Sequence, residues 1–419
     1  MGGLAPRSPR RVVITGLGPI TPIGSGVEGL WQGVLARRSA VRRITRFDPA
    51  PFSCQVAAQV DDFDPLDYMD AKRVHRLDRF AQFSLACTRL ALADARLDIA
   101  AEDAGEVGIY VGSALGGTAF AEEQHTAFVR QGIRGVTPLL ALSVFGGASS
   151  SNIAIELGIT GPNVANANSC ASGAIALGEA FRLIRGGGAQ VVLAGGVEAP
   201  LAPLTFGAFS IIKVMTARND TPQTASRPFD AGRDGFVMAE GGCMLVLEEL
   251  GHAVRRGARI YAELEGYGLT NDAHHMTAPL PSGAQSGRAI TLALREASLV
   301  PQQIGYVNAH ASSTVLNDRT ETLALKRALG DHAYHVPISG TKGMHGHALG
   351  ATGAMEAAIC CLAFCHSYLP PTVNLTSPDA DCDLDYLPGC GRHQAVQHIL
   401  TNSFGFGGIN AALVLGRAP

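Results

Sequence analysis

The sequence predicts an α/β fold in which helices cover a parallel or mixed sheet. Short apolar runs rich in β-branched residues alternate with longer amphipathic stretches, and this alternation is typical of such folds. Of the 419 residues, 50 are glycine and only 16% are charged, while 47% are hydrophobic. Because glycine recurs without a fixed period, it indicates many tight turns and close backbone approaches in a packed protein.

The first half of the chain carries four predicted strands, at residues 12–15, 107–111, 191–194 and 244–247. A predicted helix over residues 77–97 places Phe80, Phe83 and Cys87 on one face, as expected of a helix packed on a sheet. A second predicted helix, over residues 171–185, is followed by three glycines that form a strong stop signal.

The second half of the chain repeats this pattern. Its predicted strands cover residues 260–264, 304–308 and 399–403, and its predicted helices cover residues 288–298, 319–329 and 348–365. Both halves also end alike, because a glycine pair precedes the apolar runs that end at Leu247 and Leu415. We therefore predict two similar halves, residues 1–250 and 251–419, that meet at a charged turn over residues 250–259.

Charge and hydropathy exclude several classes of protein. With 33 basic and 36 acidic residues the net charge is −3, which gives no global field for nucleic acid or an anionic membrane. The longest stretch without a charged residue or a histidine, residues 157–178, contains Pro162 and three asparagines, so we reject a membrane-spanning helix there. Nine irregularly spaced cysteines do not form a disulfide framework, and a reducing cytoplasm is the expected location.

Cys170 lies between a polar loop, residues 166–169, and the predicted helix that begins at Ala171. The unpaired N–H groups at the start of a helix stabilise negative charge, so this position favours a thiolate and a nucleophilic role. The alternative is an unreactive small residue buried at a helix start.

Two histidines lie where α/β folds place ligands. His310 closely follows the predicted strand 304–308, and His347 precedes the predicted helix 348–365. His345 and His347 have the spacing of a possible metal pair, but neither a His-Glu-x-x-His motif nor Cys-x-x-Cys pairs accompany them. The loop at residues 16–18 lacks the third glycine of a dinucleotide-binding motif. We therefore predict no metal and no nucleotide cofactor.

A series of motifs runs in order along almost the whole chain. They include Val13-Ile-Thr-Gly-Leu-Gly18, Asn168-Ser-Cys-Ala-Ser-Gly173, Asn308-Ala-His-Ala-Ser-Ser-Thr314, Thr341-Lys-Gly-Met-His-Gly-His347 and Asn402-Ser-Phe-Gly-Phe-Gly-Gly408. In these motifs the chain resembles the β-ketoacyl-acyl-carrier-protein synthases of the elongating type, within the thiolase-like superfamily. The resemblance implies a five-layer αβαβα fold of two similar halves.

The resemblance also assigns the reacting groups. Cys170, in the first half, matches the family's nucleophile, while His310 and His347, in the second half, match its two histidines. In the second half, too, Lys342 matches its active-site lysine and Phe404 its gating phenylalanine. Lys342 is further expected to form a buried ion pair with Glu356.

A decarboxylative Claisen condensation in fatty acid chain elongation is the reaction that the resemblance implies. An acyl group moves from its carrier to Cys170, with the backbone N–H groups of Cys170 and Phe404 as the expected oxyanion hole. Malonyl-acyl carrier protein then loses CO₂, the two imidazoles stabilise the enolate, and its carbon attacks the acyl enzyme to give 3-oxoacyl-acyl carrier protein. This chemistry requires no redox cofactor or essential metal, because the substrates are carried on phosphopantetheine.

The partners implied are an acyl carrier protein and a second copy of the chain in a homodimer. Ser312 and Thr314 match positions that bind the pantetheine arm, and Leu115 matches one that lines the acyl pocket, although the hydroxyls are equally suited to capping a turn. An acidic carrier protein needs a basic docking patch. The positions that match one are Lys72, Arg73, Arg76 and Lys213.

Asn168, Ala311 and His345 depart from the family's usual residues without removing a reacting group. We expect Ala311 and His345 to narrow the tunnel or to change hydrogen bonds, and so to affect substrate choice. The nearest alternative is a ketosynthase of a type II polyketide or polyene pathway that works beside a chain-length partner subunit. A third hypothesis is a noncatalytic chain-length partner, but such proteins lack the nucleophile that Cys170 supplies.

Overall fold

The computed structural model describes residues 9–418, and its main sheet repeats one strand order in the two halves of the chain. The order in the first half is β6 (Asn163–Asn166), β5 (Val107–Gly112), β7 (Val191–Glu198), β8 (Gly241–Glu249) and β1 (Val12–Thr21). The order in the second half is β11 (Ile338–Ser339), β10 (Ile304–Asn308), β14 (His398–Gly405), β15 (Ile409–Arg417) and β9 (Ala262–Asn271).

Strand directions repeat as well. β5 pairs in parallel with β6 and β7, whereas β8 is antiparallel to β7 and β1. The counterparts β10 and β15 make the same pairings in the second half. The mixed sheet is therefore confirmed, and the two glycine-led strands that end the halves, β8 and β15, are equivalent.

The two halves join through a short antiparallel pairing of β1 with β9, between residues 12–14 and 262–264. The turn predicted at residues 250–259 is in part a helix, α9 (Leu250–Arg255), because the Glu249 side chain caps it by accepting from the N–H groups of Gly251 and His252. The boundary at residue 250 stays a prediction, and residues 1–8 and 419 lie outside the described part of the chain.

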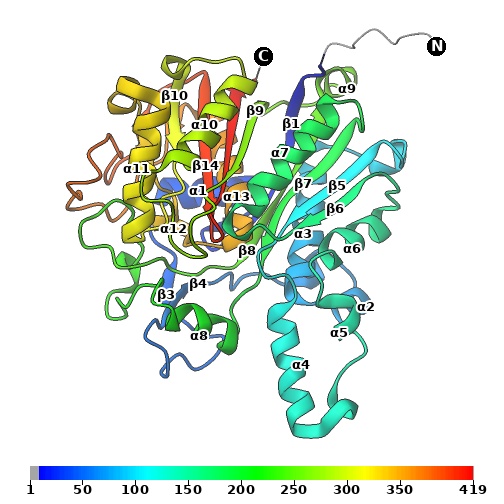
Figure 1. Cartoon of the computed structure of the whole chain (residues 1–419). Coiled ribbons are helices and arrows are strands. Elements are labelled where there is room, and N and C mark those ends of the chain that lie inside the picture. The colour runs from blue at the N-terminus through cyan, green and yellow to red at the C-terminus, as the bar shows by residue number, and fades with distance from the viewer. Residues whose placement is uncertain (1–8, 419) are drawn as a thin grey trace.

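Helices form three layers around the two halves of the sheet (Figure 1). The central layer is α7 (Ser172–Arg185) and α13 (Thr352–His366), which contact each other and strands of both halves. The outer layers are α3 (Arg79–Ala95) with α6 (Ala148–Leu157), and α10 (Ala284–Glu296) with α11 (Val315–Leu329). This arrangement confirms the five-layer αβαβα fold.

Capping side chains and glycines set the ends of these helices. α7 ends at Arg185, as predicted, with Gly186 as its cap. α11 begins at Val315 rather than at residue 319, because the Thr314 hydroxyl accepts from the N–H of Asn317 and starts the helix there. α10 likewise begins earlier than predicted, at Ala284.

The central helices approach so closely that only glycine fits at their contact. A Cβ atom at Gly173 of α7 would lie 2.8 Å from the carbonyl oxygen of Gly350, just before α13. A Cβ atom at Gly112, at the end of β5, would lie 2.3 Å from the carbonyl carbon of Ser172. These close contacts hold the start of α7 against the end of β5 and the turn before α13. Cys170 lies just before this start of α7.

The remaining helices and short strands lie around these layers. They are α1 (Gly26–Ala36), α2 (Ala71–Val74), α4 (Thr118–Gln131), α5 (Leu140–Ser143), α8 (Pro203–Ile211), α12 (Lys342–His345), β2 (Gly24–Ser25), β3 (Val41–Arg43), β4 (Val56–Ala58), β12 (Tyr368–Leu369) and β13 (Arg392–His393). Figure 1 shows α4 extending away from the layers.

One stretch, Leu349–His366, is apolar and long enough to cross a membrane, but 89% of it is buried inside the protein. It contains α13, so its hydrophobicity is that of a central core helix. The uncharged stretch 157–178 is divided among the end of α6, β6 and the first part of α7, so it is not one continuous helix.

Candidate active site

Cys170 lies in a single 3₁₀ turn, Ser169–Ala171, that leads directly into α7. Ser169 has a left-handed backbone conformation, with φ of 51°. The Ser172 hydroxyl donates to the Ser169 carbonyl at 2.7 Å and so closes this turn. Cys170 is only 9% exposed, and its exposed surface faces a cavity.

A cavity of about 220 Å³ brings most of the predicted site residues together. The two halves of the chain both contribute to its walls. Among the residues that line it are Cys170, Phe209, Lys213, Phe236, His310, Ser312, Thr314, His347, Phe404 and Phe406. Lys342 lies behind this wall, where it is fully buried.

The two histidine rings lie next to each other, with centroids 5.3 Å apart and planes at 80°. Glu321 of α11 fixes the turn that carries His310, because its carboxylate accepts from the N–H groups of His310 at 2.8 Å and Ala311 at 2.7 Å. His347 is fixed by contact of its Nδ1 with the Thr352 hydroxyl at 3.1 Å. Both histidines come from loops that precede or follow core elements, as the sequence predicted.

Burial lowers the pKa of His310 and of His347 well below the ordinary histidine value, and the positive charge of Lys342 lowers both further. Both imidazoles are therefore neutral, and each keeps one ring N–H. Nδ1 of His310 is buried without a hydrogen-bond partner. A neutral pair of this kind suits hydrogen-bond donation rather than charge pairing.

The predicted ion pair between Lys342 and Glu356 is present, with Nζ to Oε1 at 2.7 Å. Lys342 also donates to the backbone carbonyl of His310. Burial raises the pKa of Glu356 to about 7, against the opposing effect of Lys342. The pair joins α12, α13 and the turn that carries His310.

The thiolate expected from the helix start is not favoured at this cavity. Burial raises the pKa of Cys170 to about 12, although the charge of Lys342 lowers it. The carboxyl of Glu198 raises it further, and the backbone N–H of Phe406 lowers it. Desolvation therefore outweighs the groups that stabilise the anion, and the thiol is protonated at neutral pH.

Phe404 and Phe406 both line the cavity, and the backbone N–H of Phe406 is the one that lowers the pKa of the thiol. Phe404 lies within β14, where it pairs with Asn410 of β15, and its ring lies 5.9 Å from that of His310. Phe406 follows the end of β14, and its ring stacks on Phe209 at 6.1 Å. The oxyanion role expected of the Phe404 backbone and the gating role of its ring both stay predictions.

Of the predicted substrate residues, Ser312 and Thr314 line the cavity and Leu115 does not. The hydroxyls of Ser312 and Thr314 lie 2.9 Å apart, and Thr314 also caps α11, so the capping alternative holds for it. The N–H of Leu115 donates instead to the carboxylate of Glu198.

The four predicted docking residues lie in two places. Lys213 is exposed and lines the cavity. Lys72, Arg73 and Arg76 lie in and just after α2 and do not line it. Arg73 forms an ion pair with Glu156 at 2.8 Å, so part of this charge is neutralised.

None of the three departures from the family pattern lines the cavity. Asn168 donates to the Asn166 side chain at 3.2 Å, and Ala311 is held by Glu321. His345 is completely buried and contacts Thr341. Ala311 and His345 therefore do not narrow this cavity, and their effect on substrate choice stays a prediction.

Sequence reasoning missed Glu198, which ends β7 and is completely buried. Its carboxyl group accepts from the N–H groups of Ala114 at 2.7 Å and Gly350 at 2.9 Å, besides that of Leu115. Burial raises its pKa to about 7. Glu198 thereby joins the loop after β5 to the turn that precedes α13, beside Cys170.

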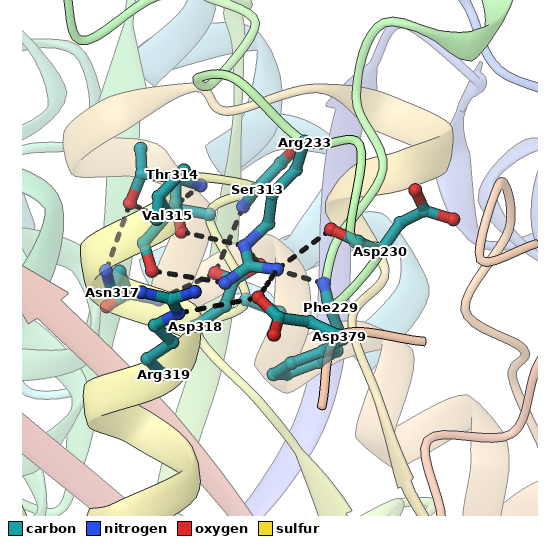
Figure 2. A network of polar contacts seen from close by, with 12 residues as sticks. Phe229, Asp230, Arg233, Ser313, Thr314, Val315, Asn317, Asp318, Arg319 and Asp379 are labelled. Atoms are coloured by element: carbon teal, nitrogen blue, oxygen red, sulfur yellow. Dashed lines mark hydrogen bonds and ion pairs between the residues drawn. The ribbon is translucent and has the colours of Figure 1, made fainter. Parts of the chain in front are cut away.

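Arg233 holds the wall of the cavity that carries Ser312 and Thr314 (Figure 2). Its guanidinium group is buried and donates to the carbonyl of Thr314 at 3.2 Å and to Asp379 at 2.8 Å. The carboxylate of Asp318, 3.4 Å from Arg233, accepts from Ser313. This network fixes the start of α11 against the loops around residues 230 and 379.

Among residues 9–418 no group of three or more His, Cys, Asp and Glu side chains is arranged to hold a metal ion. The expectation that the reaction needs no cofactor stays a prediction.

Comparison with family models decides to which family the chain belongs. The model "Beta-ketoacyl synthase, N-terminal domain" matches residues 9–253, and "Beta-ketoacyl synthase, C-terminal domain" matches residues 261–376. The chain belongs to the beta-ketoacyl synthase family. The resemblance seen in the motifs is thus confirmed, and this family member carries Cys170, His310 and His347 at one cavity.

Proteins similar to this chain include a 3-oxoacyl-[acyl-carrier-protein] synthase and ketosynthases of known structure. The 3-oxoacyl-[acyl-carrier-protein] synthase 2 of Synechocystis is 44% identical over 97% of this chain and 98% of its own length. The ishigamide ketosynthase/chain length factor has a TM-score of 0.92 at 35% identity, over 98% of this chain and 100% of that chain. A type II PKS acyl-carrier protein in complex with its ketosynthase has a TM-score of 0.90 at 35% identity, over 98% of this chain and 100% of that chain.

Proposed function

We propose that this protein catalyses the condensation of an acyl thioester with malonyl-acyl carrier protein to give 3-oxoacyl-acyl carrier protein in fatty acid chain elongation. The observation that carries the proposal is the convergence of Cys170, His310 and His347 on one buried cavity in a beta-ketoacyl synthase. The enzyme is accordingly an acyltransferase, and its 44% identical relative is named 3-oxoacyl-[acyl-carrier-protein] synthase 2.

The first step is transfer of the acyl group. The Cys170 sulfur attacks the thioester carbonyl and forms a new carbon–sulfur bond, while the pantetheine sulfur leaves and receives the proton of the thiol. The negative charge that develops on the carbonyl oxygen is proposed to be stabilised by the backbone N–H groups of Cys170 and Phe404. The position of Cys170 just before α7 supports this role.

The second step is decarboxylation of the malonyl group. As CO₂ leaves, the electron pair of the broken bond moves onto the thioester and forms an enolate, whose oxygen needs hydrogen-bond donors. Neutral His310 and His347 are suited to supply them. If the Thr352 hydroxyl donates to Nδ1 of His347, the ring proton resides on Nε2 and is available to the substrate.

The third step joins the two groups. The enolate carbon attacks the acyl carbonyl on Cys170, the carbon–sulfur bond breaks, and the Cys170 sulfur leaves as thiolate, which takes up a proton. Ser312 and Thr314 are proposed to bind the pantetheine arm, and Lys342 to support the site from behind. Phe404, beside His310, is proposed to gate the cavity, and Leu115 to contact the acyl chain beyond it.

A ketosynthase of a type II polyketide or polyene pathway is the second candidate. The structures of the type II PKS ketosynthase complex and of the ishigamide ketosynthase/chain length factor, which align over 98% of this chain, favour it. A noncatalytic chain-length partner is a weaker candidate, because the nucleophile and both histidines are in place.

The partners proposed are an acyl carrier protein and a second copy of the chain. The homodimer is supported by β6, a strand at the end of the sheet whose residues 163–165 are all exposed. On α4, too, apolar side chains are exposed, with Phe128 50% and Val129 70% exposed. If the protein works in a polyketide pathway instead, the corresponding assembly is a heterodimer with a chain-length partner.

We place the enzyme in the cytoplasm. All nine cysteines are free thiols, and seven of them are buried, which suits a reducing compartment.

The function is tested by incubating the protein with malonyl-acyl carrier protein and a panel of acyl carrier proteins, followed by intact mass analysis of the products. Fatty acid elongation is supported if the products, after reduction of the ketone, are saturated and longer than the substrate by one two-carbon unit. Repeated condensation without added reductases, or activity only with a partner subunit, would favour the polyketide reading. If no condensation occurs with either, the proposed function is wrong.

A further inference from the structure

His345 is a completely buried side chain for which the proposed reaction has no use. It is the last residue of α12, three positions after Lys342, and it does not line the cavity. Burial lowers its pKa to about 3, and Lys342 lowers it further, so the imidazole is neutral. A buried neutral imidazole needs a hydrogen-bond partner, and that partner is Thr341.

Hydrogen bonds connect His345 to the ion pair behind the active site. Nε2 of His345 lies 3.1 Å from the Thr341 hydroxyl, and this hydroxyl donates to Oε1 of Glu356 at 3.3 Å. Because an ionised carboxylate can only accept, the Thr341 proton points to Glu356. The hydroxyl oxygen is then left to accept from an Nε2–H of His345, which fixes the tautomer.

Glu356 depends on these contacts. Its Oε2 is buried without a hydrogen-bond partner, so the carboxylate is held through Oε1, by Lys342 and Thr341. The negative charge of Glu321 and burial both favour its protonated form, while Thr341 and Lys342 favour the carboxylate. The titratable groups that face Glu356 are Lys342, Glu321, Tyr306 and Cys360.

We propose that His345 is a positioning residue that acts through Thr341 to keep Glu356 ionised, and thereby holds Lys342 against the backbone carbonyl of His310. The inference rests on the proposed function for its consequence in catalysis. The hydrogen bonds themselves join side chains between residues 341 and 356, including the ion pair, and they do not depend on the substrate. Loss of the Nε2–H donor would weaken the Thr341 bond and make Glu356 easier to protonate.

The test compares His345→Leu, Thr341→Val, the double variant and His345→Gln, with Met344→Leu as the matched control. Met344 is buried in the same helix but makes none of these side-chain bonds, and the change conserves volume. The glutamine can still donate an N–H to Thr341. Two properties are measured across the neutral range, the rate of malonyl-acyl carrier protein decarboxylation and the denaturation midpoint.

We expect the acid limb of the decarboxylation profile to move to higher pH by at least about half a unit in His345→Leu and Thr341→Val. The double variant should show no larger shift than the greater of the two single shifts, because both changes break the same series of hydrogen bonds from His345 to Glu356. The profile of His345→Gln should lie close to that of the wild type, and the profile of Met344→Leu should match it. A wild-type profile in His345→Leu, or additive shifts in the double variant, would overturn the inference.

The denaturation midpoints test the inference without relying on activity. A buried carboxyl whose pKa is raised above its unfolded value stabilises the folded state less as pH rises through that folded pKa. The midpoint difference between wild type and His345→Leu should therefore widen from the wild-type folded pKa of Glu356, about 7, up to its higher folded pKa in the variant and then stay constant, whereas a simple cavity would cost the same at every pH. A constant difference would contradict the inference, and an inactive wild type would contradict only the proposed function. If His345→Leu does not fold, Thr341→Val and His345→Gln make the same comparison.

Discussion

Nζ of Lys342 lies 2.7 Å from Oε1 of Glu356, and both side chains are buried. The same Nζ donates to the backbone carbonyl of His310, so one cation connects α12, α13 and the turn after β10. Its charge also lowers the pKa of His310 and His347, which keeps both imidazoles neutral. The ion pair is therefore a link between the stability of the core and the state of the histidines.

Lys342→Met is expected to destabilise the protein by about 3–5 kcal/mol, because it leaves the Glu356 carboxyl buried without its partner. Urea denaturation at neutral pH measures this loss. The double variant Lys342→Met/Glu356→Met removes both charges and should recover much of it. If the single variant is as stable as the wild type, the pair does not stabilise Glu356 as described.

His310→Ala and His347→Ala are each expected to slow malonyl decarboxylation by about 10²–10³-fold, since each removes one hydrogen-bond donor to the enolate. Acyl transfer to Cys170 should be retained, because its proposed oxyanion donors are backbone groups. Both steps are measured on the same preparations, decarboxylation by CO₂ release and acylation by intact mass. Variants that fail only in acylation would show that the histidines do not stabilise the enolate.

The layers of the fold could be predicted from the sequence because the apolar runs that form the strands are short and repeat in both halves. Cys170, His310 and His347 were also predictable, since each lies near the end of a strand or the start of a helix. The motif after residue 402 holds two phenylalanines, and the sequence does not show that Phe404 lies within β14 whereas Phe406 follows its end.

Other features of the site depend on tertiary packing. Glu198 ends an apolar strand, and the sequence alone suggests an ordinary surface residue there. Only the fold brings the three backbone N–H groups that donate to its carboxyl group close to it. The raised pKa of Cys170 is a balance between burial and nearby positive groups, and a sequence does not give the degree of burial. That Leu115 does not line the cavity likewise follows from packing that the sequence does not give.

Alkylation of Cys170 by iodoacetamide is expected to be slow at neutral pH and to keep rising above pH 9, the ordinary thiol value, because burial raises its pKa. Lys342→Met should slow it further, since the charge of Lys342 lowers this pKa. Peptide mass mapping separates Cys170 from the exposed Cys365 and Cys390. A rate that is already constant at neutral pH would show that the helix start outweighs burial.

Lys213→Glu is expected to raise KM for carrier-bound substrates about tenfold while sparing small thioesters, because Lys213 is exposed at the cavity. Arg76→Glu tests the second predicted position, beside α2, in the same way. Arg295→Glu is the matched control, since this exposed arginine of α10 does not line the cavity. Equal loss with both kinds of substrate would count against docking at the tested residue.

The most direct test of the account is elongation by Cys170→Ala and Cys170→Gln, followed by intact mass of protein and products. The wild type should acquire the mass of the acyl group from acyl-acyl carrier protein and release a 3-oxoacyl product. Neither variant should be acylated or condense, and Cys170→Gln should still decarboxylate malonyl-acyl carrier protein. Undiminished elongation by either variant would contradict the claim that Cys170 is the nucleophile.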